Sequence, residues 1–228
     1  MKKTILAVCT VFVFNLVNAQ DFKHSISLSF GTATPKGDFG SLDINNNKAG
    51  GAAAGICIDL EYKGFLFHDK IGMLGLIKNQ FNPMDGDYLA LQTPVGTTVT
   101  SDNWVLNGYL LGAFYDVQLG EKGFFHPKVA VGMLNATSPK LAFETQGINF
   151  LTINSASSTG FSTMFGADFG LNLGNFKLQA QYDFLLANPT FNQKAVDETG
   201  AVIATNDFTQ SMQTYNVKLS VGYNFGSK

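Results

Sequence analysis

The sequence contains no arginine, because all 15 of its basic residues are lysines. It therefore lacks the rigid guanidinium fork that grips carboxylates and phosphates at two points, and this excludes arginine-based anion recognition. Charge is scarce as well: 14% of the residues are charged, the formal net charge is −2, and no basic run occurs. We therefore do not expect nucleic acid as a partner.

Long apolar runs are also missing. The segment MKKTILAVCTVFVFNLVNA has Lys2 and Lys3, then an apolar run of about a dozen residues, then Val17 and Ala19 at the −3/−1 positions. It predicts a signal peptide over residues 1–19, cleaved to leave a barrel domain over 20–228. A lipoprotein signal ending at Cys9 is disfavoured, since the cleavage site prefers small residues. No segment provides the ~20 apolar residues of a membrane-spanning helix, so a helical membrane protein is excluded.

Cysteine is nearly absent from the exported part of the chain. Once the signal peptide is removed, Cys57 is the only cysteine, so no intramolecular disulfide can form. Removal of two lysines takes the formal net charge from −2 to about −4. The stability of the mature protein must therefore come from its fold, and we assign no function to Cys57.

What the sequence does have is alternation. Side chains of a β-strand point to opposite faces with period two, and about eight segments show this pattern, whereas no helix of period 3.6 stands out. In YNVKLSVGYNF, for example, Tyr215, Leu219 and Phe225 share the apolar face. The segments are 22–34, 50–63, 71–81, 104–119, 125–137, 159–173, 175–188 and 212–225. They predict an all-β fold, an eight-stranded antiparallel up-and-down transmembrane β-barrel.

The connections between these segments alternate in length. Those near 64–70, 120–124 and 174–175 are short, whereas those near 35–49, 82–103, 138–158 and 189–211 are long. Outer-membrane barrels combine short periplasmic turns with long external loops. Two long connections contain predicted hairpins, one around Gln146 and Gly147 and one around residues 198–200.

The two faces of the strands differ in charge. The less apolar face carries Asp59, Glu61, Lys63, Asp116, Lys128, Asp168, Lys177, Asp183 and Lys218. Aromatic residues near strand ends suit the boundary between lipid and water; they are Tyr62, Tyr109, Tyr115, Tyr182, Tyr215, Tyr223 and Phe225. We therefore predict that the apolar face meets lipid. The alternative is a secreted soluble β-barrel or sandwich with an apolar core.

On these features the chain resembles the small OmpA/OmpX-type, porin-like outer-membrane β-barrels of Gram-negative bacteria. The resemblance covers residues 21–225 and implies location in the cell outer membrane, contact with its lipid, and recognition of the last strand by the barrel-assembly machinery. Lys218, Tyr223 and Phe225 match that assembly signal. Ser220 stands where the family usually has glycine, and three residues follow the aromatic that would normally end the chain.

Inside an eight-stranded barrel there is room for little more than side chains. Buried charges need partners, so the nine charged residues of the polar face are expected to form a closed lumen charge network. The inward glycines Gly31, Gly132, Gly166, Gly170 and Gly222 are the one feature that favours gaps and hence a channel. The expected role is structural, or surface interaction through protruding extracellular loops and an unidentified surface protein.

Catalytic and metal chemistry find little support. Acid/base catalysis by Asp59, Glu61, Asp168 or Asp183 is disfavoured by the facing lysines. His24, His68 and His126 lack ligand spacing, and Asp85 and Asp87 in NPMDGDY lack a full calcium loop. We therefore predict no catalytic residue, metal or cofactor. The alternatives to the interaction barrel are a narrow porin-like channel for ions or small solutes and, third, a barrel enzyme.

Overall fold

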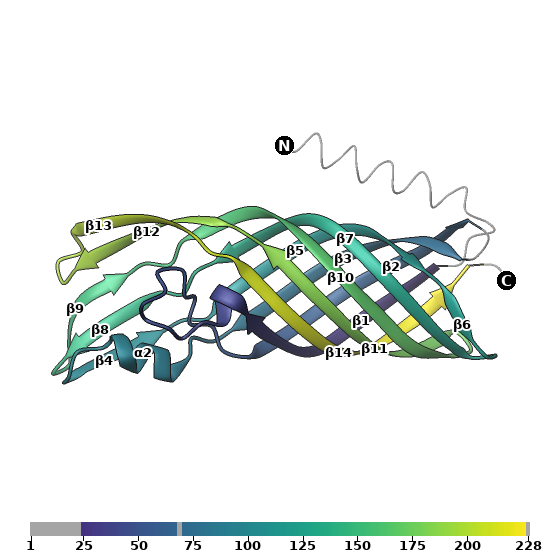
Figure 1. Cartoon of the computed structure of the whole chain (residues 1–228), viewed down its shortest axis with the longest axis horizontal. Coiled ribbons are helices and arrows are strands. Elements are labelled where there is room, and N and C mark those ends of the chain that lie inside the picture. The colour runs from purple at the N-terminus through teal and green to yellow at the C-terminus, as the bar shows by residue number, and fades with distance from the viewer. Residues whose placement is uncertain (1–23, 68–69, 227–228) are drawn as a thin grey trace.

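Eight long strands close into one antiparallel barrel (Figure 1). The computed structural model describes residues 24–67 and 70–226. The strands are β1 (His24–Lys36), β2 (Gly55–Phe67), β3 (Ile71–Asn82), β5 (Trp104–Tyr115), β7 (Gly123–Thr137), β10 (Ser157–Leu173), β11 (Phe176–Ala187) and β14 (Met212–Phe225). Each pairs with the next along the chain, and β1 pairs with β14 to close the ring. The predicted fold class is confirmed, while the predicted signal peptide lies outside the described residues.

The period-two pattern explains why these segments form strands. In β1, Ser25, Ser27 and Ser29 are buried, whereas Ile26, Leu28 and Phe30 are exposed. The least regular predicted strand, 71–81, is β3, which carries apolar residues on both faces. Leu74 and Leu76 point into the barrel, while Met73 and Ile77 point out.

The two ends of the barrel differ as the loop lengths predict. His24 pairs with Phe225 at the end that carries the short turns, including the three-residue strand β6 (Val117–Leu119). The turn between β10 and β11 is tight, and Gly174 there has φ of +70°, which glycine adopts without steric cost. Since short turns are periplasmic in outer-membrane barrels, we call this the periplasmic end and the opposite one the extracellular end.

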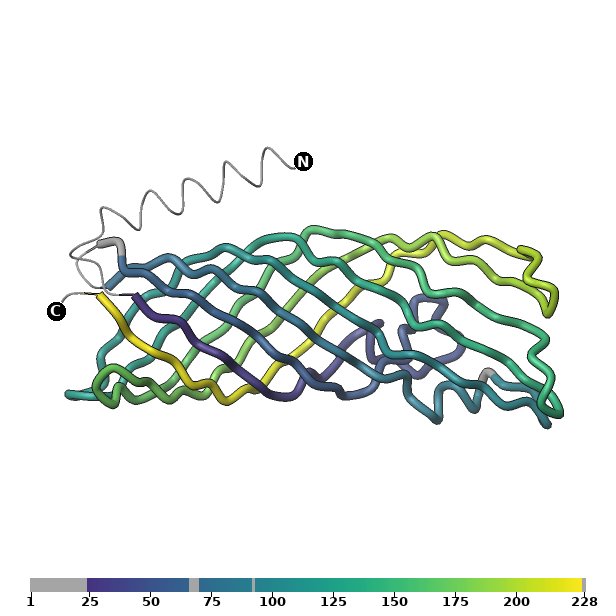
Figure 2. Tube along the Cα trace, turned by 180° about the vertical axis from the view of Figure 1, so that it is seen from behind, coloured from purple at the N-terminus to yellow at the C-terminus, as the bar shows by residue number. Residues whose placement is uncertain are grey.

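The long connections build a second sheet beyond the extracellular end (Figure 2). It contains β4 (Thr97–Ser101), β8 (Leu141–Thr145), β9 (Ile148–Ile153), β12 (Thr190–Asp197) and β13 (Val202–Thr209), in the order β13-β12-β9-β8-β4. Both predicted hairpins are present, as β8–β9 and β12–β13. The remaining elements are the 3-10 turn η1 (Gly37–Gly40) and the helix α2 (Gly86–Gln92). Within residues 24–67 and 70–226, no helix has the length and apolarity to cross a membrane.

Large apolar side chains cover the outside of the barrel. Leu219 is 70% exposed and Leu28 is 60% exposed, whereas the neighbouring Ser220 is 1% exposed. An exterior of this kind fits lipid, so the prediction of a transmembrane barrel in the cell outer membrane is confirmed and the soluble alternative is wrong. Two of the aromatic residues expected near strand ends, Tyr109 and Tyr182, lie instead in the middle of β5 and β11.

Candidate functional site

The structure places all nine charged residues of the predicted lumen network inside the barrel, each at most 7% exposed. Three come from alternate positions of β2 and two from β11, while β7, β10 and β14 contribute one each and Asp116 lies between β5 and β6. Their arrangement follows from the strand period: each inward position is separated from the next by an outward, lipid-facing residue.

Four carboxylates and four lysines form a continuous interior ion cluster. The Lys128 ammonium lies 2.9 Å from Glu61 Oε2, 2.8 Å from Asp168 Oδ1 and 3.3 Å from Asp183 Oδ1. Lys63 bonds Asp168 and is 3.1 Å from Glu61 Oε1. Two more lysines complete the cluster: Lys218 bridges Asp59 and Asp183, and Lys78 is 3.2 Å from Asp59 Oδ2. With four charges of each sign, the cluster is formally neutral.

The cluster is a structural necessity once these charges are inside. Removing an ion from water costs several kcal/mol, and the cost is offset only when each charge has well-placed partners. Lys78 is a partner that the sequence analysis missed. Its signal was the position it shares with Leu74 and Leu76 on the inward face of β3, but the apolar character of both faces obscured this.

Two members of the predicted network lie outside the ion cluster. Lys177 donates a hydrogen bond to Ser25 Oγ at 2.8 Å, and no carboxylate among the described residues lies within 4.0 Å of its ammonium. Asp116 is 2.7 Å from His126 Nε2 and accepts a second hydrogen bond from Gln118. Seven of the nine predicted residues therefore pair within the ion cluster, whereas Lys177 and Asp116 do not, contrary to the expectation of one closed network.

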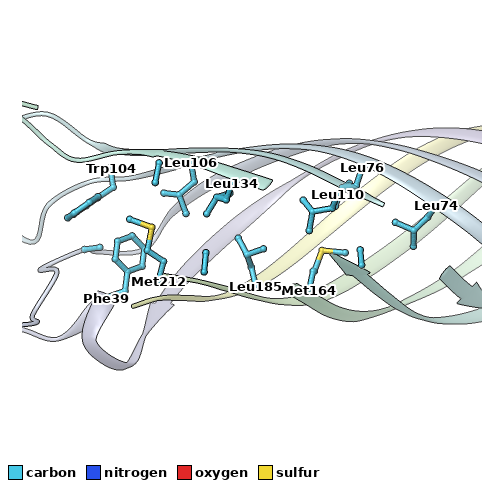
Figure 3. Packing of buried hydrophobic residues seen from close by; sticks show 14 of the residues in the cluster. Phe39, Leu74, Leu76, Trp104, Leu106, Leu110, Leu134, Met164, Leu185 and Met212 are labelled. Atoms are coloured by element: carbon cyan, nitrogen blue, oxygen red, sulfur yellow. The ribbon is translucent and has the colours of Figure 1, made fainter. Parts of the chain in front are cut away.

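A second interior layer, which the sequence analysis did not predict, is apolar (Figure 3). The apolar layer lies toward the extracellular end and consists of Phe39, Trp104, Leu106, Leu134, Leu185, Phe191 and Met212, all buried. The same cluster continues along the inner wall, beside the ion cluster, through Met164, Leu110, Leu76 and Leu74 (Figure 3). Trp104 packs edge-on against Phe39 and Phe191, with ring centroids 5.5 and 5.7 Å away. Its indole N–H donates to the Gly50 carbonyl at 3.1 Å, which ties the first long loop to the barrel.

The inward glycines do not leave gaps. A Cβ at Gly222 would lie 2.8 Å from both Lys177 Cγ and Ser27 Oγ, and a Cβ at Gly31 would lie 2.8 Å from Lys218 Cγ. The other three are just as crowded: Gly166 faces the Asp183 carboxylate, Gly170 the Phe124 ring, and Gly132 the backbone of β5. The glycines thus make room for neighbouring groups. They do not leave gaps in the lumen, so they no longer favour a channel.

A cavity of about 1060 Å³ opens at the periplasmic end, and we call it the periplasmic vestibule. Its lining includes His24, Lys63, Asp116, His126 and Lys177. His24 Nδ1 lies 2.7 Å from the Tyr62 hydroxyl, and the His126 ring stacks on Phe124. His68 lies outside the described residues. Across those residues, no three His, Cys, Asp or Glu side chains are grouped as metal ligands.

The remaining candidate residues have local explanations. Asp85 caps α2, since its Oδ1 accepts hydrogen bonds from the backbone N–H groups of Asp87 at 2.9 Å and Tyr88 at 3.2 Å. Of the assembly-signal residues, Lys218 lies inside the barrel, whereas Tyr223 and Phe225 are on its outside. Recognition of these three by the assembly machinery stays a prediction.

Comparison with known proteins shows the fold. No family model matches the chain, and no curated protein matches it in sequence. A major outer membrane protein from Thermus thermophilus is similar in structure, with a TM-score of 0.61, 11% identity, and coverage of 90% of this chain and 100% of that one. The attachment invasion locus protein Ail of Yersinia pestis has a TM-score of 0.48 at 16% identity, covering 89% and 98%. The outer membrane protease OmpT from Escherichia coli has 0.49 at 9% identity, covering 91% and 98%.

At these identities the likeness concerns the fold alone, and the scores of Ail and OmpT are too low to carry an argument. The Thermus protein, together with the closed ring of strands and the apolar exterior, is sufficient for one conclusion. The chain has the fold of a small outer-membrane β-barrel.

Proposed function

We propose that this protein is an interaction barrel of the outer membrane, with a lumen closed by its own side chains and a binding surface formed by the extracellular sheet. Two interior layers support a closed lumen. The ion cluster joins β2, β3, β7, β10, β11 and β14 across the barrel, and the apolar layer lies on its extracellular side. A solute would have to displace both layers to pass.

The observation that carries the proposal is the edge strand β13. It is the outermost strand of the extracellular sheet, pairs only with β12 among the described residues, and is exposed along nearly its whole length. Natural proteins protect such edges with lysine, proline or a covering segment, because an open edge pairs readily with another chain. The β13 sequence VIATNDFT has no lysine or proline and a single charge.

Exposed apolar side chains accompany this edge. Val202 and Ile203 are 56% and 58% exposed. An extended partner segment that adds to β13 would gain main-chain hydrogen bonds and bury these side chains. The partner that fits is an extended segment of another surface protein. The barrel anchors the sheet, as rigid scaffolds commonly hold binding loops.

The proposal is tested by photo-crosslinking on intact cells. A photoreactive amino acid at Ile203 should give a discrete cross-linked species, and one at the exposed Asn47 of the first long loop should not. Ala204→Lys, which adds charge to the edge, should abolish the species when combined with the probe at Ile203. Equal labelling from both sites, or no effect of the lysine, would contradict edge pairing.

A second candidate is a narrow channel for ions or small solutes, and the periplasmic vestibule is the observation that favours it. The vestibule brings solvent as far as Lys63 and Lys177. Conduction would require both interior layers to open. A barrel enzyme has no comparable support, since the carboxylates of the ion cluster are each paired with lysine.

A further inference from the structure

The buried lysines of the barrel differ in whether a carboxylate lies close to the ammonium group. Within the ion cluster, every lysine has a carboxylate within 4.0 Å. Lys177 is the exception: it is 3% exposed, it lines the vestibule, and its only polar contact among the described residues is the Ser25 hydroxyl. An ammonium group has three donors, and only one hydrogen bond of Lys177, the one to Ser25, is formed within the described residues.

Two small neutral residues, Gly222 and Ser27, lie near the Lys177 side chain. Gly222 stands beside its side chain, and a Cβ there would lie 2.8 Å from Lys177 Cγ. The neighbouring Ser27 hydroxyl is buried and has no hydrogen-bond partner. Lys177 thus lines the vestibule beside Gly222, and no carboxylate among the described residues lies within 4.0 Å of its ammonium.

The vestibule has more lysines than acids that lack a partner in the barrel. Its charged lining consists of Lys63, Lys70, Lys122 and Lys177 with Asp116 and Glu121, and of these Lys63 is already paired with Glu61 and Asp168. Asp116, the buried acid, is engaged by His126 and Gln118, while Glu121 is exposed at the rim. Asn172, Asn175 and Asn224 add neutral groups that can donate hydrogen bonds.

We propose that the periplasmic vestibule binds a small, water-soluble, phosphate-bearing solute, with Lys177 as the buried cation that holds the phosphate. Lysine acts as a point charge that suits phosphate, whereas planar carboxylates are best matched by the arginine fork that this chain lacks. The volume of about 1060 Å³ accommodates a small organic phosphate. The strands separate the interior of the vestibule from the bilayer, so the solute enters through the periplasmic opening. Phosphate binding in the vestibule is independent of the proposed partner binding by the extracellular sheet.

The test is a titration of the full-length mature protein, refolded in neutral detergent, with inorganic phosphate at constant ionic strength. Calorimetry should show saturable binding, and acetate should bind more weakly. Lys177→Met should weaken phosphate binding by about 10- to 100-fold, the range for a hydrogen bond to a charged group. The matched control Lys48→Met, on the exposed first loop, should bind like the wild type.

A second variant keeps the proposal falsifiable if Lys177→Met does not fold. Ser25→Asp places a carboxylate where a hydroxyl now lies 2.8 Å from the Lys177 ammonium. It should reduce phosphate affinity to a similar extent without lowering the unfolding temperature. Failure of the wild type to bind phosphate above a chloride background would overturn the proposal, as would unchanged binding by either vestibule variant. Equal affinity for acetate would overturn the assignment of phosphate.

Discussion

Two buried lysines, Lys177 and Lys218, look equivalent in the sequence and differ in their surroundings. Both alternate with lipid-facing residues near the middle or start of a strand, and both are at most 3% exposed. Lys218 bridges Asp59 and Asp183, whereas Lys177 bonds only a serine hydroxyl. Strand alternation shows which face a charge lies on but not its partner, because the partner comes from another strand at a height set by the barrel shear.

The first prediction follows from this difference. Lys218→Met leaves two buried carboxylates underpaired, so the free energy of unfolding should fall by about 3–5 kcal/mol, the range for breaking a buried pair. Lys177→Met is the matched control and should cost less, since no carboxylate within 4.0 Å loses a partner. Urea-induced unfolding in lipid vesicles measures both. Equal losses would mean that the pairing of Lys218 with two carboxylates adds no stability beyond that of Lys177.

At the scale of elements, the β12–β13 hairpin depends on one carboxylate in its turn. Asp197 Oδ1 accepts hydrogen bonds from Thr199 Oγ1 at 2.7 Å and from the backbone N–H groups of Thr199 and Ala201 at 2.9 Å. Gly200 takes φ of +82° to allow the turn. The Thr199 hydroxyl and the backbone donors lower the pKa of the Asp197 carboxyl below its ordinary value of 3.8.

The second prediction concerns the pH dependence of this turn. Because the folded-state pKa is lowered, the carboxylate stabilises the hairpin fully above pH 3.8, and this contribution is lost as the pH falls through the lower folded-state pKa. NMR titration should show the Thr199 and Ala201 amide shifts changing with a midpoint below 3.8. Thr199→Val removes one donor and should raise the midpoint. A midpoint that is the same in the variant would contradict the role of the hydroxyl.

Sequence patterns predicted the elements better than their assembly. The eight barrel strands and both hairpins are visible in the sequence, because period-two alternation and turn residues are local signals. The extracellular sheet was not predicted as a unit, since it depends on pairing of Ala195 with Ile153, two residues in different loops. The apolar layer was missed for a similar reason: Phe39 and Phe191 reach Trp104 from separate loops.

At the scale of the whole molecule, the interior changes character along the barrel axis. Solvent enters the periplasmic vestibule, the ion cluster follows, and the apolar layer lies next to the extracellular sheet. Both layers are built from several strands, so opening a path would separate paired charges and expose apolar surface to water. Each of these changes is unfavourable.

The last prediction tests this one-sided access. Cys57 is 0% exposed and is the only cysteine beyond the predicted signal peptide. In a Cys57→Ser variant, an introduced cysteine is therefore the only thiol of the mature protein. A charged thiol reagent should modify a cysteine placed at Asn175, which lines the vestibule, but not one placed at Leu106 in the apolar layer. Planar bilayers containing the unmodified protein should show no conductance steps. Steady conductance together with labelling at Leu106 would favour the channel over the closed interaction barrel, because ions and reagent would then share a path through both layers.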